Sequence, residues 1–201
     1  MSNYYFSEKP KSKLETKEIQ INIEGEKLKF VSPSAVFSYG KIDKASFTLV
    51  KNCHVSKGAK VLDLGCGYGF IGITLAKMRD DIELIFTDIN ERAVFFCKKN
   101  IKLNKLSNER AKVLQGDMFE PVQSEMFDVI LSNPPMHAGR KMCYQVIDEA
   151  KNHLKKQGSL QLVARHQRGG KMLMQHMQEQ FGNVETLAKE GGFRVYKSIL
   201  A

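Results

Sequence analysis

A glycine-rich stretch and a carboxylate that follows it could together hold a nucleoside cofactor. The stretch 63–69, DLGCGYG, follows a short apolar run and places glycines at three alternate positions. Glycines at this spacing allow the backbone to approach a ligand closely. Asp88, 21 residues after Gly67, could accept hydrogen bonds from both hydroxyls of a ribose. Together these features predict binding of a nucleoside-containing cofactor.

The position of Asp63 selects among such cofactors. Gly67, Gly69 and Gly72 also satisfy the spacing of a nicotinamide-binding loop. A carboxylate just before the first glycine would, however, repel a pyrophosphate placed there. The same carboxylate would attract a cofactor that carries a cationic amino group and a sulfonium centre. S-adenosylmethionine has both, so it is the expected cofactor.

A second chemical segment is Asn133-Pro134-Pro135-Met136, which follows a later apolar strand. Ligands of open parallel sheets bind at the carboxyl ends of the strands, so this segment should face the cofactor. An exocyclic amine on an aromatic ring is a weak nucleophile because its lone pair is delocalised. The side-chain oxygen of Asn133 and the backbone carbonyl of Pro134 could each accept one of its N–H groups. This would aim the lone pair at the methyl group without a strong general base, on a loop that the prolines stiffen.

The composition indicates one domain with a basic excess. The chain has 201 residues, 31 Lys and Arg, 22 Asp and Glu, and a formal net charge of +9. Lysines and arginines are concentrated between residues 133 and 178, a segment that contains eight of them and only two acidic residues. This surplus favours a polyanionic partner such as RNA.

Other classes of protein are disfavoured. No apolar run approaches the roughly 18 residues that a membrane span needs, and the N-terminus lacks the apolar core of a secretory signal. The cysteines at 53, 66, 97 and 143 form no Cys-x-x-Cys pair, so neither a zinc site nor a disulfide framework is expected. The sequence thus predicts a cytoplasmic protein with reduced thiols and no metal.

Alternating strands and helices predict an α/β fold that positions these groups in a single domain over residues 1–201. We expect a loosely held basic arm over 1–17, a β-hairpin and a first helix capped by Asp43 within 18–58, and a catalytic core over 59–201. The expected core strands cover residues 59–64, 84–87, 112–115, 127–131 and 159–164, and the expected helices include 70–78, one capped by Asn90, one with Val146, Ile147, Ala150 and Leu154 on one face, and one that ends near Phe181. The closing segment 184–200 predicts two strands without a helix between them, and hence one antiparallel strand near the C-terminus.

The loop at 63–69 resembles motif I of the class I methyltransferases, which use S-adenosylmethionine. The turns at Asp88-Ile89 and Asp117-Met118 resemble the ribose-binding and adenine-contacting turns of that family, in the same order and spacing. The resemblance implies a Rossmann-like fold with a seven-stranded, mostly parallel sheet. The cofactor-binding residues that it implies are Asp63, Gly65, Cys66, Gly67, Gly69, Asp88, Ile89, Asp117, Met118 and Asn133. Cys66 is then a small residue in a crowded turn rather than a nucleophile.

Residues 133–136 resemble motif IV of the amino-methyltransferases, which act on adenine N6, guanine N2 or glutamine side chains. Those enzymes usually have Tyr or Phe at the fourth position, where this chain has Met136. The segments 34–46, 133–139, 182–185 and 192–197 resemble the small-subunit ribosomal RNA guanine-N2 methyltransferase family, in its short archaeal form with the catalytic domain alone. The implied catalytic residues are Asn133, Pro134, Pro135 and Met136.

Five further residues are candidates for contacts with the substrate: Phe37, His137, Arg140, Arg165 and Arg168. Phe37 could line the base pocket or belong to the core. His137 could contact an RNA phosphate or pack within its loop. Arg165 and Arg168 follow a strand on the crevice side, where they could hold RNA or form a solvated loop.

The sequence therefore predicts a methyltransferase that acts on an exocyclic amine of RNA. The expected target is guanine N2 of ribosomal RNA, either free or in the small ribosomal subunit. A protein glutamine methyltransferase is one alternative, because it shares the Asn-Pro-Pro segment, although its substrate would not demand a basic face. A non-catalytic RNA-binding module is another, but the presence of Asp63, Asp88 and Asn133 argues against it.

Overall fold

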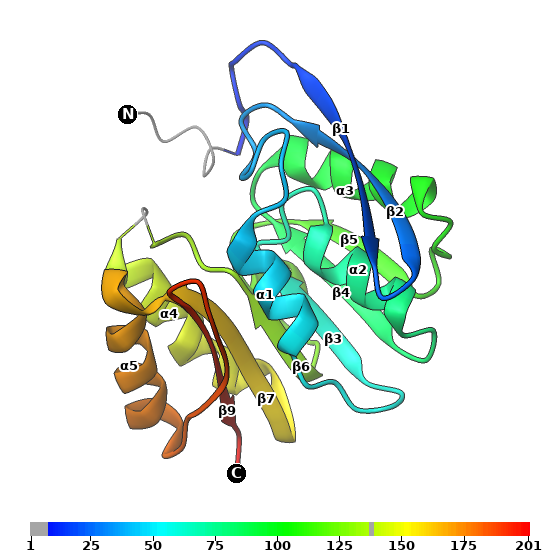
Figure 1. Cartoon of the computed structure of the whole chain (residues 1–201). Coiled ribbons are helices and arrows are strands. Elements are labelled where there is room, and N and C mark those ends of the chain that lie inside the picture. The colour runs from blue at the N-terminus through cyan, green and yellow to red at the C-terminus, as the bar shows by residue number, and fades with distance from the viewer. Residues whose placement is uncertain (1–7, 137–138) are drawn as a thin grey trace.

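The computed structural model describes residues 8–136 and 139–201, in which strands and helices alternate along the chain (Figure 1). The strands are β1 (Thr16–Ile23), β2 (Glu26–Pro33), β3 (Lys60–Leu64), β4 (Glu83–Asp88), β5 (Ala111–Gln115), β6 (Phe127–Ser132), β7 (Leu154–Arg165), β8 (Glu185–Glu190) and β9 (Phe193–Ile199). The helices are α1 (Lys44–Asn52), α2 (Phe70–Met78), α3 (Glu91–Leu103), α4 (Arg140–Ala150) and α5 (Lys171–Phe181), with the short helical turns η2 (Glu120–Val122), η4 (Lys151–His153) and η5 (His166–Gly170). Within the described residues, no helix is long and apolar enough to cross a membrane.

Seven strands form one sheet in the order β5-β4-β3-β6-β7-β9-β8, and β1 pairs with β2 as a separate hairpin. Neighbouring strands from β5 to β7 are parallel, whereas β9 runs antiparallel to both β7 and β8. The predicted sheet, with its single antiparallel strand near the C-terminus, is confirmed. The cause is the connection: only Gly191-Gly192 separates β8 from β9, and parallel strands need a longer crossover.

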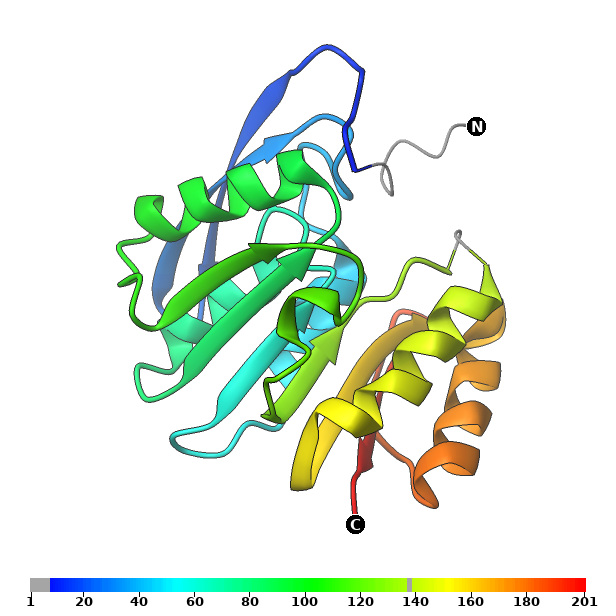
Figure 2. The same ribbon diagram turned by 180° about the vertical axis from the view of Figure 1, so that it is seen from behind.

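The helices cover both faces of the sheet, and each face has its own apolar core (Figures 1 and 2). Leu49 of α1, Ile73 of α2 and Phe96 of α3 belong to one core, which also includes residues of the hairpin. Ile147 of α4 and Leu173 of α5 belong to the other. Because both faces are covered, β3 and β6 are buried almost throughout instead of alternating.

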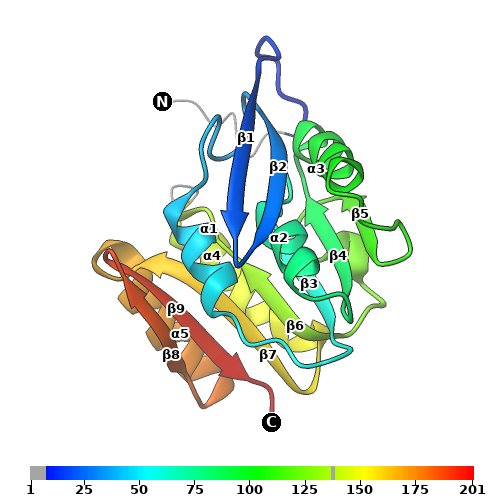
Figure 3. The same ribbon diagram turned by 45° about the vertical axis from the view of Figure 1, so that its right-hand side comes forward.

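The predicted hairpin lies beside α2 and α3 (Figure 3). Its turn at Glu24-Gly25 has φ values of 51° and 88°, as a two-residue hairpin turn requires. Phe30 is fully buried in the core below it. The side chain of Asn100 on α3 accepts from the N–H of Val31 at 2.8 Å and donates to its carbonyl at 3.1 Å. The hairpin is thus fixed to α3 through its backbone as well as its apolar side chains.

The described part of the N-terminal arm, residues 8–15, differs from the loosely held arm that we predicted. Arg92 of α3 donates to the carbonyl of Ser12 at 2.8 Å. The hydroxyl of Ser34 donates to the carbonyl of Lys13 at 2.9 Å. Strand β1 also begins at Thr16, inside the range expected for the arm. Sequence patterns gave no sign of these contacts because a single arginine on a helix has no periodicity.

The structure corrects the position of Leu154. The spacing predicts this residue on the same helical face as Ala150, but α4 ends at Ala150 and Leu154 begins β7. Leu154 packs in the same apolar core as α4, which is why it matches the helical pattern. Strand β7 is also longer than predicted, because it continues through a kink at Gln157, where φ is 63°.

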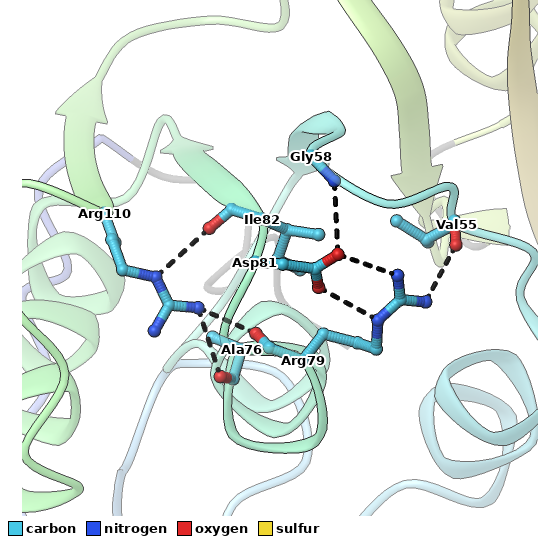
Figure 4. A network of polar contacts seen from close by, with 7 residues as sticks. All are labelled: Val55, Gly58, Ala76, Arg79, Asp81, Ile82 and Arg110. Carbon is cyan, nitrogen blue, oxygen red and sulfur yellow. Dashed lines mark hydrogen bonds and ion pairs between the residues drawn. The ribbon is translucent and has the colours of Figure 1, made fainter.

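Two arginines fasten the loops at the amino-terminal edge of the parallel strands (Figure 4). Arg79 donates to the two carboxylate oxygens of Asp81 at 3.1 and 3.3 Å and to the carbonyl of Val55 at 2.8 Å. The hydrogen bond from Arg79 lowers the pKa of Asp81. Arg110 donates to the carbonyls of Arg79 and Ile82 at 2.7 and 3.3 Å. Carbonyl groups that follow α2 thus find donors, and this edge of the sheet is held together.

Gly72 allows α2 to lie close against the sheet. A Cβ atom at this position would overlap the ring of Phe86 on β4 and would lie 3.1 Å from Oδ2 of Asp63. The N–H of Gly72 donates to that oxygen at 2.9 Å. The third glycine of the motif is therefore needed for packing between helix and strand.

We expect Gly72→Ala to lower the free energy of unfolding by about 2–3 kcal/mol, because extra volume in a close-packed core forces neighbouring groups to move. Urea denaturation would measure this loss. Phe86→Leu removes the ring that the new methyl group meets, so the double variant should lose less than the sum of the two single losses. Additive losses would contradict this packing explanation.

Candidate active site

Strand register brings the predicted site segments together at the carboxyl edge of the sheet. Leu64 of β3 pairs with Thr87 of β4 on one side and with Ser132 of β6 on the other. The glycine loop, Asp88 and Asn133 therefore follow three neighbouring strands at one level. The hydroxyl of Ser132 also donates to the carbonyl of Leu64 at 2.8 Å, which ties β6 to the start of the loop.

The glycine loop has a backbone conformation that other residues rarely adopt. The φ values of Gly65, Gly67 and Gly69 are 70°, 56° and 91°. At Gly69 a Cβ atom would in addition crowd neighbouring side chains at 2.7 and 2.8 Å. The N–H groups of Gly65 and Cys66 both donate to the carbonyl of Thr87 at 2.9 Å. The loop is thus held against β4 by its own backbone.

Asp88 links the glycine loop to the start of α3. Its Oδ2 accepts from the N–H of Gly67 at 2.8 Å, and its Oδ1 accepts from the N–H of Asn90 at 2.9 Å. Burial raises the pKa of Asp88, while these two hydrogen bonds act in the opposite direction. A carboxylate oxygen can accept more than one hydrogen bond, so a ribose with two hydroxyls would fit at Asp88.

Asp63 is fully buried beneath the loop, with 0% of its surface exposed. Its Oδ2 accepts from the N–H of Gly72, but its Oδ1 has no hydrogen-bond partner among the residues that the structure describes. Burial raises the pKa of Asp63 to about 7, and the nearby charge of Asp88 adds to this effect. A cationic group next to this unpartnered oxygen would stabilise the charged form of the buried carboxyl group. The carboxylates of Asp63 and Asp88 thus fit a cofactor that carries a positive amino group and a ribose.

Cys66 lies buried within the loop, and its thiol is close to that of Cys97 on α3. Burial raises the pKa of the Cys66 thiol well above its usual value. The thiol therefore stays protonated at neutral pH, which agrees with a small loop residue and not with a nucleophile. All four cysteines of the chain are free thiols.

Asn133 is fixed by Ser46 of α1 and by Asp43, the residue that caps this helix. Its Nδ2 donates to Oδ2 of Asp43 and to the hydroxyl of Ser46, both at 3.0 Å. A carboxylate only accepts hydrogen bonds, so the NH₂ end of the amide must face Asp43. Within the residues that the structure describes, no donor reaches the Oδ1 atom of Asn133. This amide oxygen is therefore available to a donor from a ligand.

The two prolines and Met136 extend from Asn133. Pro134 is buried, and its carbonyl accepts from the N–H of Met136 at 2.9 Å, which leaves capacity for one further hydrogen bond. The Sδ atom of Met136 lies 3.8 Å from Sγ of Cys143 on α4. Its methyl group occupies the space where a Cβ atom at Gly169 would be. Met136 thus connects this segment to α4 and to η5.

The third predicted turn also reaches the edge of the site. Asp88 pairs with Gln115 at the end of β5, and the N–H of Gly116 donates to the carbonyl of Asp88 at 3.1 Å. Asp117 is exposed directly after this contact, and Met118 follows with a φ of 46°. Ile89 is half-buried beside them, with its carbonyl accepting from the side chain of Gln115 at 3.3 Å. The structure thus places Asp117, Met118 and Ile89 next to Asp88.

The predicted substrate residues lie around this edge. The side chain of Phe37 is 49% exposed, and its neighbour Val36 is buried over Gly67. Arg140 begins α4, while Arg165 ends β7, and both are exposed. The guanidinium of Arg165 stands 4.7 Å from the ring centroid of Phe193, and Arg168 lies exposed in η5. His137 lies outside the described residues.

Sequence reasoning missed that Asp43 and Ser46 contact Asn133. Asp43 was predicted as the cap of α1, and the structure confirms this, because its carboxylate accepts from the N–H of Ser46 at 2.8 Å. The capping role accounts for an aspartate at this position without any second partner. The only signal in the sequence was the resemblance of the segment 34–46 to a methyltransferase family.

Comparison with known proteins agrees with this geometry. The family model described as the methyltransferase small domain matches residues 27–197. The chain belongs to the methyltransferase small domain family. The family prediction and the predicted Rossmann-like fold are thereby confirmed.

Several relatives of this methyltransferase are similar over most of its length. The uncharacterized protein YbxB of Bacillus subtilis is 33% identical, and the match covers 98% of both chains. Ribosomal RNA small subunit methyltransferase C of Hamiltonella defensa is 35% identical over 82% of this chain and 48% of its own length. The chain thus spans about half the length of this second relative. A relative of similar length is therefore found in a bacterium.

A solved structure supports the same assignment. The T. thermophilus 16S rRNA N2 methyltransferase RsmC, in complex with AdoMet and guanosine, superposes with a TM-score of 0.80 and 26% identity. The match covers 96% of this methyltransferase and 52% of that chain. A methyltransferase from Pyrococcus furiosus shares the fold, with a TM-score of 0.65 and 19% identity over 77% of this chain and 80% of its own.

The burial of Asp63 predicts a pH-dependent gain in stability for Asp63→Asn. The folded chain binds the proton of this carboxyl more tightly than the unfolded chain does, because its pKa rises from 3.8 to about 7 on folding. Stability of the native protein should therefore fall as the pH rises through this window. Relative to the native protein, the variant should gain about 2–3 kcal/mol between pH 5 and pH 8.

Urea denaturation of both proteins at the two pH values would measure this gain. Asp81→Asn is the matched control, because the pKa of Asp81 is lowered from 3.8 and the stability that it contributes is nearly complete by about pH 5. Its difference from the native protein should be the same at pH 5 and pH 8. If the difference between Asp63→Asn and the native protein were also the same at both pH values, the pKa of Asp63 would not be raised on folding.

Proposed function

We propose that the protein is an S-adenosylmethionine-dependent methyltransferase that methylates an exocyclic amine of RNA, with guanine N2 of ribosomal RNA as the target. The observation that carries this proposal is the fixed amide of Asn133, whose oxygen is free to accept from an amino group of the substrate. A neighbouring structure in complex with AdoMet and guanosine supports both the methyl donor and the base.

S-adenosylmethionine supplies an electrophilic methyl group on a sulfonium centre. Asp63 would hold its amino group, because a cation next to the unpartnered oxygen compensates the cost of burying a carboxylate. The backbone of Gly65, Cys66, Gly67 and Gly69 would follow the methionyl part. Asp88 and Ile89 would contact the ribose, and Asp117 and Met118 the adenine: these assignments rest on the position of each turn at the carboxyl edge.

Asn133 and Pro134 would position the substrate nitrogen. The Oδ1 atom of Asn133 accepts one N–H of the amine, and the carbonyl of Pro134 accepts the other. These contacts hold the lone pair toward the donor methyl, and the nitrogen loses a proton only as it gains positive charge. Such orientation accounts for about 7–11 kcal/mol of rate enhancement in ideal cases. No histidine or carboxylate needs to act as a strong base.

The substrate class is supported by charge and by relatives. The net charge is +9, and Arg140, Arg165 and Arg168 are exposed on the β7 side of the site. Relatives named ribosomal RNA small subunit methyltransferase C point in the same direction. Phe37 would stack on the target base, since Met136 is engaged with α4. The contact of His137 with an RNA phosphate and the cytoplasmic location stay predictions from the sequence.

The proposed substrate is tested with radiolabelled S-adenosylmethionine and three pools: unmodified total RNA, small ribosomal subunits and total protein. Labelled products are digested and identified by mass spectrometry. We expect N2-methylguanosine in RNA, because the site accepts a planar amine on a polyanion. Label in glutamine side chains of protein would contradict the proposal and favour the alternative.

We expect Asn133→Ala to reduce kcat by about 10²–10³-fold while the Kd for S-adenosylmethionine changes little, because the lost contact orients the acceptor and not the donor. Single-turnover methyl transfer and calorimetric binding of the cofactor measure the two effects. Turnover near that of the native protein would show that the amide does not position the substrate.

Asp43→Asn tests the orientation of the Asn133 amide. Both contacts use Oδ2 of Asp43, so an asparagine that turns its NH₂ group toward Asn133 also removes the acceptor that caps α1. The two amides would then compete for orientation, and Asn133 would present its NH₂ to the substrate in part of the molecules. We expect kcat to fall about tenfold, together with a loss of about 1 kcal/mol in the free energy of unfolding, because one oxygen atom serves both contacts. Unchanged kcat would contradict the role assigned to Asp43.

A further inference from the structure

The outer face of α3 carries a basic stripe with an exposed aromatic ring. Phe95, Lys98, Lys99 and Lys102 are all exposed and follow the spacing i, i+3, i+4 and i+7, so they lie along one side of the helix. Phe95 is 62% exposed, more than the other exposed large apolar residues of the described chain. The opposite side of α3 is buried in the core, so this stripe is the surface that the helix offers to a partner.

The lysines of this stripe lack acidic partners. In the part of the chain that the structure describes, none of the three forms an ion pair. Lys98 and Lys102 stand one turn apart, where like charges destabilise a helix slightly. Lys99 is 5.6 Å from the ring centroid of Phe96, which is a contact with a neutral group. The stripe therefore presents uncompensated positive charge around a flat aromatic ring.

The N-terminal arm extends this surface toward the site. Arg92 donates to Ser12 and to Ser34, and the N–H of Glu91 donates to the carbonyl of Glu8 at 3.0 Å. These contacts fasten residues 8–15 across the first turn of α3, and they use only neutral acceptors. Lys11 and Lys13 of the arm are exposed there.

The stripe and the two arginines Arg140 and Arg165 lie on opposite sides of the candidate site at the carboxyl edge of the sheet. Helix α3 begins directly after Asp88, next to β5 at one end of the strand order. Arg140 and Arg165 belong to α4 and β7, on the other side of β3 and β6. Figures 1 and 2 show α3 and the hairpin on one side of the molecule and α4 and α5 on the other.

We propose that the α3 stripe and the fastened arm bind the backbone of the substrate RNA outside the catalytic site. Lysines without acidic partners neutralise phosphates and release counterions, and an exposed ring such as Phe95 stacks on an unpaired base. A membrane surface fits less well, because a helix that binds one needs a broad exposed apolar face, and the apolar side of α3 is buried. The RNA would then cross the edge from α3 to α4. This inference rests on the proposed function and adds a second contact surface to it.

Two triple variants of equal charge test the proposal. Lys98→Gln, Lys99→Gln and Lys102→Gln alter the stripe. Lys51→Gln, Lys57→Gln and Lys156→Gln remove three exposed lysines at the end of α1, in the following loop and near the start of β7, at the opposite edge of the sheet. The probe is small-subunit ribosomal RNA transcribed without modifications, and its binding to the full chain is measured between 50 and 200 mM salt.

The stripe variant should bind this RNA about tenfold or more weakly, and the slope of log K against log salt should fall by about 2–3, since each phosphate contact contributes nearly one. Phe95→Ala alone should weaken binding about fivefold or more through lost stacking. The control triple should change affinity and slope much less. Methyl transfer by the stripe variant should show a raised KM for RNA with kcat and the Kd for S-adenosylmethionine unchanged.

Equal effects of the two triple variants would overturn the proposal, since the loss would then follow overall charge. So would native affinity of the stripe variant for an RNA that the native protein methylates, which would leave the proposed function intact. If the native protein methylates protein and does not bind the RNA, both the proposed function and this inference fail.

Discussion

Two carboxylates on neighbouring strands, one fully buried and one half-buried, set the conditions for the rest of this structure. Asp63 and Asp88 end neighbouring strands, and burial raises the pKa of each. Backbone N–H groups of Gly67, Gly72 and Asn90 partly compensate this cost, and they can do so only if the loop and both helix starts are held in place. The left-handed glycines, the close approach of α2 and the cap of α3 all serve that requirement. The site is thus prepared for a cationic cofactor before it binds.

The acceptor side of the site depends on a different kind of order. Asn133 needs a defined amide orientation, and its own strand does not provide one. Asp43 provides it from α1, while also capping that helix. One carboxylate therefore both caps a helix and sets the orientation of the Asn133 amide. Because one oxygen atom of Asp43 serves both contacts, the start of α1 and the residue that follows β6 are held together.

Exposed basic residues lie on two sides of the candidate site. This chain spans about half the length of the relatives named as ribosomal RNA methyltransferases. These basic residues belong to α3 and the N-terminal arm on one side of the carboxyl edge of the sheet, and to α4 and β7 on the other side. Arg92 fastens the arm through neutral oxygen atoms, so the positive charge of the flank is not lost. The fold itself thus supplies two surfaces around one site.

The sequence by itself determined the elements, their order and the chemistry of the cofactor site. Glycine spacing, the acidic residues at strand ends and the Asn-Pro-Pro segment are local signals, because each depends on backbone geometry within a few residues. Leu154 was misplaced because a core position looks the same on a helix and on the strand that follows it. Only the tertiary structure decided the partners of Asn133, the fastening of the arm by Arg92 and the surface of α3. These contacts join residues up to 90 positions apart, and no local pattern of residue types encodes which distant side chain will meet a given polar atom.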